Sequence, residues 1–192
     1  MKKLVLLALL ATGASTVSAQ KLELIPKAGI NISKQAMDAT NAEKFKIGFQ
    51  GGLGLNIHTG AGGFSVQPEI NFVGKGTKLE FAGRKSNLEL NYLELPVLAK
   101  YAFGPVYINA GPSIALMIDK ESKFINNYGS APKKFEFGVQ MGAGVALPVG
   151  PGKIIIDGRY ALGLTDVSKS AGIKNRGIMA SLGYAIPLGG KK

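Results

Sequence analysis

The chain of 192 residues contains 27 glycines, no cysteine and 46% hydrophobic residues, and its formal net charge is +11 at pH 7. The absence of cysteine excludes a disulfide framework, and so much glycine in so hydrophobic a chain argues against both disorder and a helical bundle. The basic excess suits nucleic acid, an acidic membrane surface or simple solubility, so the positions of the charges have to decide between them.

The first residues have the layout of a secretory signal peptide. Lys2 and Lys3 precede an apolar run over residues 4–14, and small residues lead to Ala19, after which we expect cleavage. The alternative is that this run is a membrane-anchor helix, although it is too short to cross a bilayer. No later segment reaches the ~18 consecutive apolar residues that a membrane-spanning helix needs. We therefore divide the chain into a signal peptide, residues 1–19, and one exported domain, residues 20–192.

Apolar residues recur with a period of two in eight segments of this domain, which predicts β-strands with one apolar face. The segments are residues 22–32, 46–58, 64–73, 88–101, 106–118, 135–147, 153–164 and 177–188. In the third segment, Phe72 and the other even-numbered residues are mostly apolar, whereas Gln67 and Glu69 belong to the odd-numbered polar face. The pattern predicts an all-β fold.

The fourth segment carries charges within an otherwise apolar stretch. Glu94 and Lys100 are six residues apart, so their side chains point to the same face of a strand. A transmembrane β-barrel accepts this arrangement, because its outer face meets lipid and its inner face is polar. We expect a lumenal network that plugs the barrel with paired charges, and a proton or ion pathway is the alternative interpretation. Its predicted members are Gln67, Glu69, Glu94, Lys100, Asp157 and Arg159.

The connections between the expected strands alternate between long and short. Residues 33–45, 74–87, 119–134 and 165–176 form the long ones, and the short ones follow His58, Tyr101 and Leu147. Eight strands joined in this order place all long loops at one end of a barrel and both termini at the other. Outer-membrane barrels have this asymmetry, with short periplasmic turns and longer external loops.

Most of the basic excess falls in the long connections. They hold thirteen basic and six acidic residues, a balance of +7 out of the +9 that remains once Lys2 and Lys3 are removed. We expect external loops that lie near the phosphates of lipopolysaccharide or bind an anionic envelope protein, and we find no basic run of the kind that binds nucleic acid. The basic loop residues singled out are Lys75, Lys78, Arg84, Lys85, Lys120, Lys123, Lys133, Lys134, Lys169 and Lys174.

Proline and glycine add two local expectations. Pro68, Pro96 and Pro112 cannot donate hydrogen bonds to a strand ladder, so we expect them at bulges or near the membrane boundaries. Inward-facing glycines such as Gly142 and Gly144 should leave room for long charged side chains in a narrow lumen.

Three stretches of the chain, "VQPEINFVGKGTKLE", "LNYLELPVLAKY" and "VYINAGPSIALMI", resemble the PorT-like family of outer-membrane β-barrels of the Bacteroidota. The shared pattern is Pro68-Glu69, Lys75-Gly76, the run from Tyr92 to Leu98, and Gly111-Pro112. The resemblance implies an eight-stranded barrel in the outer membrane. It also implies, as one candidate role, an accessory component of a protein-secretion system, because the namesake of the family is tied to one. The chain departs from many outer-membrane barrels in ending "YAIPLGGKK" rather than on an aromatic residue.

Other function classes find less support in the sequence. The single histidine, His58, has no acidic residue within ten positions, and no His or Cys cluster suggests a metal site, so we expect neither an enzyme nor a bound cofactor. A soluble lipocalin-like carrier of a small apolar ligand is also an eight-stranded barrel, but it would turn Phe72 and Leu95 inward and Glu69 and Glu94 outward. A conducting pore would need a wider barrel than eight strands form.

These observations predict a closed eight-stranded antiparallel up-and-down transmembrane β-barrel in the cell outer membrane. We expect a small, plugged, monomeric barrel that acts as a structural or interaction protein, with its partners among lipid, lipopolysaccharide and envelope proteins.

Overall fold

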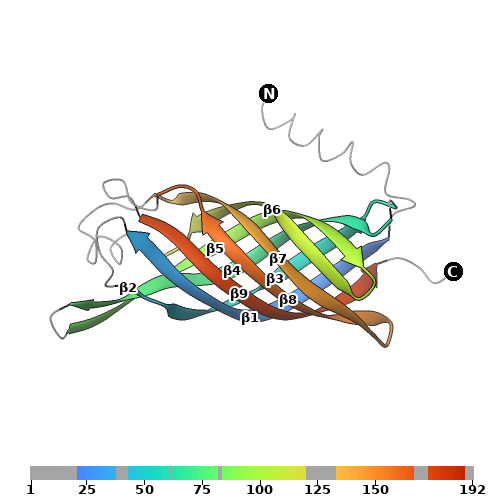
Figure 1. Cartoon of the computed structure of the whole chain (residues 1–192), viewed down its shortest axis with the longest axis horizontal. Helices are drawn as coiled ribbons and strands as arrows, with labels where there is room; N and C mark the ends of the chain where they lie inside the picture. The colour runs from blue at the N-terminus through green and yellow to red at the C-terminus, as the bar shows by residue number, and fades with distance from the viewer. Residues whose placement is uncertain are drawn as a thin grey trace, which may run out of the picture.

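The protein forms a closed β-barrel, as Figure 1 shows for the computed structural model. The structure describes residues 21–37, 43–60, 62–81, 84–119, 133–166 and 173–188; of these, residues 34–37, 43–44, 76–81, 84–89 and 173 are described by their backbone alone. The predicted signal peptide lies outside the described residues. Among the described residues, no helix is long and apolar enough to cross a lipid bilayer.

Eight long antiparallel strands form the wall, and the predicted fold is confirmed. Neighbouring strands in the chain pair with one another, and β1 pairs with β9 to close the barrel. A two-residue strand, β2 (Glu43–Lys44), pairs with β4 at one end. The long strands are β1 (Leu22–Met37), β3 (Lys46–His58), β4 (Phe64–Phe81), β5 (Arg84–Phe103), β6 (Val106–Met117), β7 (Phe135–Val149), β8 (Gly152–Gly163) and β9 (Ile173–Leu188).

The two faces of the wall have opposite chemistry. Phe72 and Leu95 point outward and are 39% and 47% exposed, whereas Glu69 and Glu94 point into the lumen and are 6% and 2% exposed. Large apolar side chains cover the outside of every long strand for which side chains are described, and most buried side chains on the inside are polar or charged. The lipocalin-like alternative is therefore wrong, because it requires the reverse orientation.

The two ends of the barrel differ as the sequence predicts. Tight turns at Gly104 and Gly150, where the backbone φ angles are +65° and +60°, lie at the same end as the first and last strand residues, Leu22 and Leu188, which pair with each other. Glycine suits these turns because other residues rarely adopt a positive φ. This end carries the short turns, and in an outer-membrane barrel such an end faces the periplasm.

The connection expected over residues 74–87 is mostly not a loop. Strand β4 continues to Phe81 and β5 begins at Arg84, and the two remain paired from Gly74–Asn91 to Phe81–Arg84, which forms a hairpin that extends the external end of the barrel (Figure 1). Backbone hydrogen bonds to a neighbouring strand hold this segment extended despite its glycines and charged residues. Composition alone therefore predicted a loop where the structure has a hairpin. Strand β9 likewise begins before Lys174, within the expected loop 165–176.

The prolines lie within the strands without forming bulges, so that expectation is wrong. At Pro68, pairing with β5 continues while pairing with β3 lapses for two residue pairs and resumes in the same register. Pro96 keeps its pairing with β6 and loses it with β4, and Pro112 keeps β7 and loses β5. A strand has two edges and proline lacks its donor on one of them, so the other edge maintains the register.

Two inward glycines make room for the polar side chains of the lumen. A Cβ on Gly142 would come within 2.8 Å of Cγ of Arg159, and a Cβ on Gly144 within 2.3 Å of the hydroxyl oxygen of Tyr107. The glycines therefore let these long side chains lie against the wall.

The orientation of the wall can be tested with a charge on its lipid face. Ile70 is 45% exposed and lies six residues along β4 from Phe64, which adjoins a short turn. Replacing Ile70 with Arg should lower the free energy of unfolding in lipid vesicles by about 2–4 kcal/mol, because the guanidinium charge would lie near the bilayer midplane. The matched change Phe64→Arg, near the interface, should lower it by only about 0–1 kcal/mol. Urea titrations measure both, and equal effects would contradict this orientation.

Candidate functional site

The lumen is crossed at its middle by a charged layer centred on Glu69 of β4. Both terminal nitrogens of Arg159, on β8 across the barrel, donate to the Glu69 carboxylate at 2.8 and 2.9 Å. The ammonium of Lys27, on β1, donates to the same carboxylate at 2.5 Å. Gln67 and Asn71, two residues to either side, donate at 2.6 and 2.9 Å. A bidentate arginine pair with every acceptor site in use is the geometry in which a buried ion pair is best stabilised.

Asp157 extends this layer along β8. It forms an ion pair with the Arg159 side chain and accepts hydrogen bonds from the Tyr107 hydroxyl at 2.7 Å and from the Asn109 amide at 2.9 Å. Strands β1, β4, β6 and β8 therefore contribute to one connected set of charges across the lumen. The set links strands that are not neighbours in the sheet, so it ties opposite sides of the wall together.

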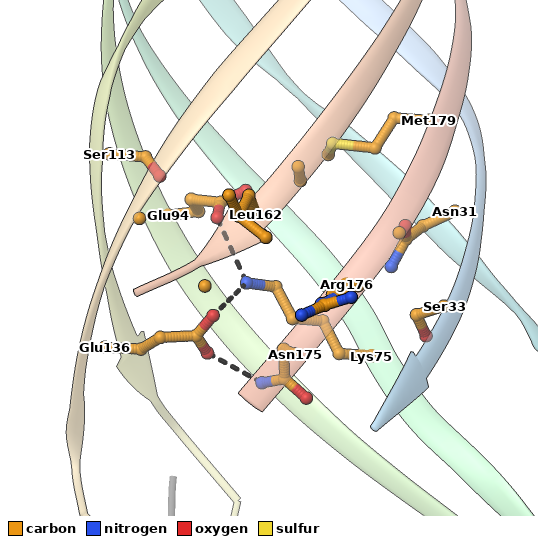
Figure 2. Close-up of a pocket in the computed structure, with 14 residues that line it drawn as sticks. Asn31, Ser33, Lys75, Glu94, Ser113, Glu136, Leu162, Asn175, Arg176 and Met179 are labelled. Carbon is orange, nitrogen blue, oxygen red and sulfur yellow. Dashed lines mark hydrogen bonds and ion pairs between the residues drawn. The ribbon is translucent and has the colours of Figure 1, made fainter. Parts of the chain in front are cut away.

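A second charged layer lies toward the external end and is drawn in Figure 2. Lys75 of β4 donates to Glu94 of β5 at 3.1 Å and to Glu136 of β7 at 3.4 Å. Asn175 of β9 donates to the other oxygen of Glu136 at 2.7 Å, and the Lys75 ammonium also lies 5.0 Å from the centre of the Tyr92 ring. The free space among these side chains is about 10 Å³, which is room for no more than about one water molecule.

A third cluster lies at the periplasmic end around Glu23. Its carboxylate accepts from Lys153 at 2.7 Å and from Asn56 at 2.9 Å, and it lies 3.0 Å from Nε2 of His58. These contacts join the first residues of β1 to β3 and β8. Charged clusters thus lie at three levels of the lumen, near its external end, at its middle and at its periplasmic end.

The structure buries all six residues predicted to line the lumen. Their exposed fractions range from 2% for Glu94 to 6% for Glu69 and Lys100. The predicted set is Gln67, Glu69, Glu94, Lys100, Asp157 and Arg159. Five of them belong to the two layers described above through direct ion pairs or hydrogen bonds to a carboxylate, and Lys100 lies beyond them toward the periplasm.

Sequence reasoning missed several charged members of the described lumen, among them Glu23, Lys27, Lys75 and Glu136. Glu23 and Lys27 are odd-numbered residues in the first segment, and the alternation of that segment would have placed them inward. Glu136 belongs to the face predicted to be polar but was not included in the network. In each case the alternation held the required signal.

The expectation that Lys75 lies in an external loop is wrong. Its side chain is 6% exposed and pairs inside the barrel, because β4 continues past Val73 with unchanged alternation.

The other basic residues assigned to external loops have several outcomes. Lys78, Arg84 and Lys85 belong to the extended strands β4 and β5, and Lys174 is exposed on β9. Lys133 and Lys134 are exposed just before β7, where the prediction put a loop. Lys120, Lys123 and Lys169 lie outside the described residues.

Among the described residues, no three His, Cys, Asp or Glu side chains gather in a way that could hold a metal ion. The lone histidine, His58, contacts Glu23 and Asn56 in the periplasmic cluster.

Comparisons with known proteins agree with this architecture. The sequence model of the family described as "Outer membrane protein beta-barrel domain" matches residues 18–169. None of the curated proteins matches the chain in sequence. Among solved structures, the outer membrane protein OprG from Pseudomonas aeruginosa is similar over 88% of this chain and 97% of its own, with 10% identity and a TM-score of 0.55.

Two further solved barrels resemble the chain more distantly. The attachment invasion locus protein Ail of Yersinia pestis covers 86% of this chain and 98% of its own length, with 18% identity and a TM-score of 0.47. Neisserial surface protein A covers 83% of this chain and 95% of its own length, with 13% identity and a TM-score of 0.46.

The middle layer makes a quantitative prediction. Replacing Glu69 with Ala leaves the charges of Arg159 and Lys27 buried without their acceptor, so the free energy of unfolding should fall by about 3–5 kcal/mol. Urea unfolding in lipid vesicles, followed by circular dichroism, measures the change. The double variant Glu69→Ala/Arg159→Ala should lose clearly less than the sum of the two single variants, because it removes both partners. Additive losses would show that the two side chains do not interact.

Proposed function

Because this chain belongs to the outer membrane protein beta-barrel domain family, we propose that it serves in the outer membrane as a closed barrel with a structural or interaction role rather than as a pore or an enzyme. The observation that carries the proposal is the pair of charged layers that cross the lumen. Arg159 of β8 and Lys27 of β1 both pair with Glu69 of β4, and Lys75 bridges Glu94 and Glu136. An eight-stranded barrel has an interior only wide enough to be filled by such side chains.

The residues that carry the PorT-like resemblance support a structural role for the fourth-strand motif. Tyr92, Glu94 and Leu98 are at most 2% exposed, and Pro96 is also buried, so the alternate positions of the fourth-strand pattern face the lumen. Gly111 lies so close to β5 that an added Cβ would be 2.0 Å from the carbonyl oxygen of Val97. These residues shape the interior and the packing of the wall. A secretion partner would have to be recognised elsewhere, on the external loops or the rims.

Lipopolysaccharide is the partner that we propose for the external rim. Lys174 and Arg176 are exposed and alternate along β9 with the buried Asn175, so both point away from the lumen, and Ile178 follows on the same face at 54% exposure. Two cations above an apolar band match a phosphate headgroup above acyl chains. Lys133 and Lys134 add exposed basic residues before β7.

Electrical recording tests the closed lumen. The purified protein in planar bilayers should give no stable single-channel openings, because the charged layers leave no continuous water path. The Arg159→Ala variant, which removes the longest side chain of the middle layer, is the matched control and should increase ion leakage. Large, stable conductance from the unaltered protein would contradict the proposal.

Charge reversal tests the lipopolysaccharide contact. The double variant Lys174→Glu/Arg176→Glu should weaken binding to lipopolysaccharide-containing vesicles by at least tenfold, because each basic residue near an anionic surface contributes about 1 kcal/mol. The loss should shrink at high salt. Lys21→Glu, an exposed change at the opposite end of the barrel, should leave binding unchanged. Equal effects of the two variants would refute a specific external site.

A further inference from the structure

The periplasmic end of the lumen holds a cavity of about 350 Å³ that none of the charged layers fills. It lies between the turn at Gly104–Pro105 and the ends of β3 and β7, and the middle layer around Glu69 lies farther into the barrel. The volume falls within the range of small-molecule sites. It corresponds to roughly ten water molecules. The cavity is therefore a cup that opens to the periplasm and ends inside the barrel.

Lys100 lines the cavity and differs from the other lumenal cations. Its side chain is buried at 6% exposure, its ammonium donates to Oε1 of Gln67 at 3.3 Å, and it lies 3.7 Å from the centre of the Tyr107 ring. Among the described residues, no carboxylate comes within ion-pair distance of Lys100, whereas Lys27, Lys75, Lys153 and Arg159 each have one.

The contacts of Lys100 do not replace an anion. A cation–π contact contributes about 0.5–2 kcal/mol, and a hydrogen bond to a neutral amide contributes about as much as an ordinary hydrogen bond. Together they offset only part of the desolvation cost of a buried ammonium. The one carboxylate that lines the cavity, Glu23, is already engaged by Lys153, Asn56 and His58. The cavity therefore has an excess of positive charge centred on Lys100.

The rest of the lining indicates what kind of anion would fit. Asn56 is 2% exposed, and its Oδ1 has no hydrogen-bond partner, while its Nδ2 donation to Glu23 fixes which way the amide is turned. This acceptor suits a hydroxyl or N–H group on a ligand. Tyr107, whose ring Lys100 contacts, and Ile155 belong to an apolar cluster against which Ala146 packs. The lining therefore combines polar and cationic groups with an adjoining apolar surface.

We propose that this cavity binds a small carboxylate- or phosphate-bearing solute from the periplasm, with the anionic group on Lys100 and the organic body against Ile155 and Tyr107. The site needs no opening through the barrel, because ligand would enter and leave through the same mouth. It is separate from the external rim, so it adds a second, inward-facing binding surface to the closed barrel.

Solution NMR of the isotope-labelled, refolded protein tests the proposal. A neutral maltoside detergent is used so that no headgroup phosphate competes. Hexanoate and glycerol 3-phosphate are titrated separately at constant ionic strength, with hexylammonium as the cationic control. At least one anion should give saturable shifts of the Asn56 side-chain amide and the Lys100 backbone amide, with a Kd of about 1 mM or lower. The anion that saturates identifies the carboxylate or the phosphate class.

Variants decide whether Lys100 holds the anion. Lys100→Met should weaken binding at least tenfold, and Lys100→Arg should retain it. Lys21→Met removes an exposed lysine at the same end and should change nothing. Ala146→Phe keeps every charge but fills the cavity, so it should also abolish binding, and it decides the question if Lys100→Met fails to fold. Heat-dependent gel migration checks the fold of each variant.

Several outcomes would overturn the proposal. These are shifts that rise linearly without saturation for both anions, equal binding of hexylammonium, undiminished binding by Lys100→Met or Ala146→Phe, and an equal loss in Lys21→Met.

Discussion

The structure depends on one constraint, the neutralisation of charge inside a tube too narrow for bulk water. Lipid outside the wall forces polar side chains inward, and the interior of eight strands forces them into contact. Glu69 meets this constraint with two cations and two amide donors, and Lys75 meets it with two carboxylates. The glycines opposite Arg159 and Tyr107 belong to the same solution, since bulk on the wall would displace the long side chains that pair.

The facing of the strands could be predicted from sequence because lipid and lumen impose a strict period of two. The ends of the strands could not, because Gly74-Lys75-Gly76 has the composition of a turn and only pairing with β5 makes it a strand. The partners in the lumen were also beyond sequence reasoning. Glu69 and Arg159 are 90 residues apart and lie on strands that are not neighbours, so their contact follows from closure of the barrel.

The prolines show how a second paired edge holds a strand in place. Proline in a sheet is expected on edge strands, at the start of a strand or at a bulge. In this barrel each strand is held along two edges, and Pro68, Pro96 and Pro112 each keep full pairing on one of them. The lapse of two residue pairs on the other edge is then bridged in register. Each of these prolines therefore interrupts one edge of its strand without shifting the register.

The free space in the lumen also differs between the two ends of the barrel. About 10 Å³ is free in the external layer, against about 350 Å³ at the periplasmic mouth. The ion pairs of Lys75 and Arg159 lie between the external end of the barrel and the cavity, and Lys100 lines the cavity on their periplasmic side. In the site that we propose, a solute would reach Lys100 from the periplasm. The proposed closed barrel would then have one binding surface turned toward each compartment.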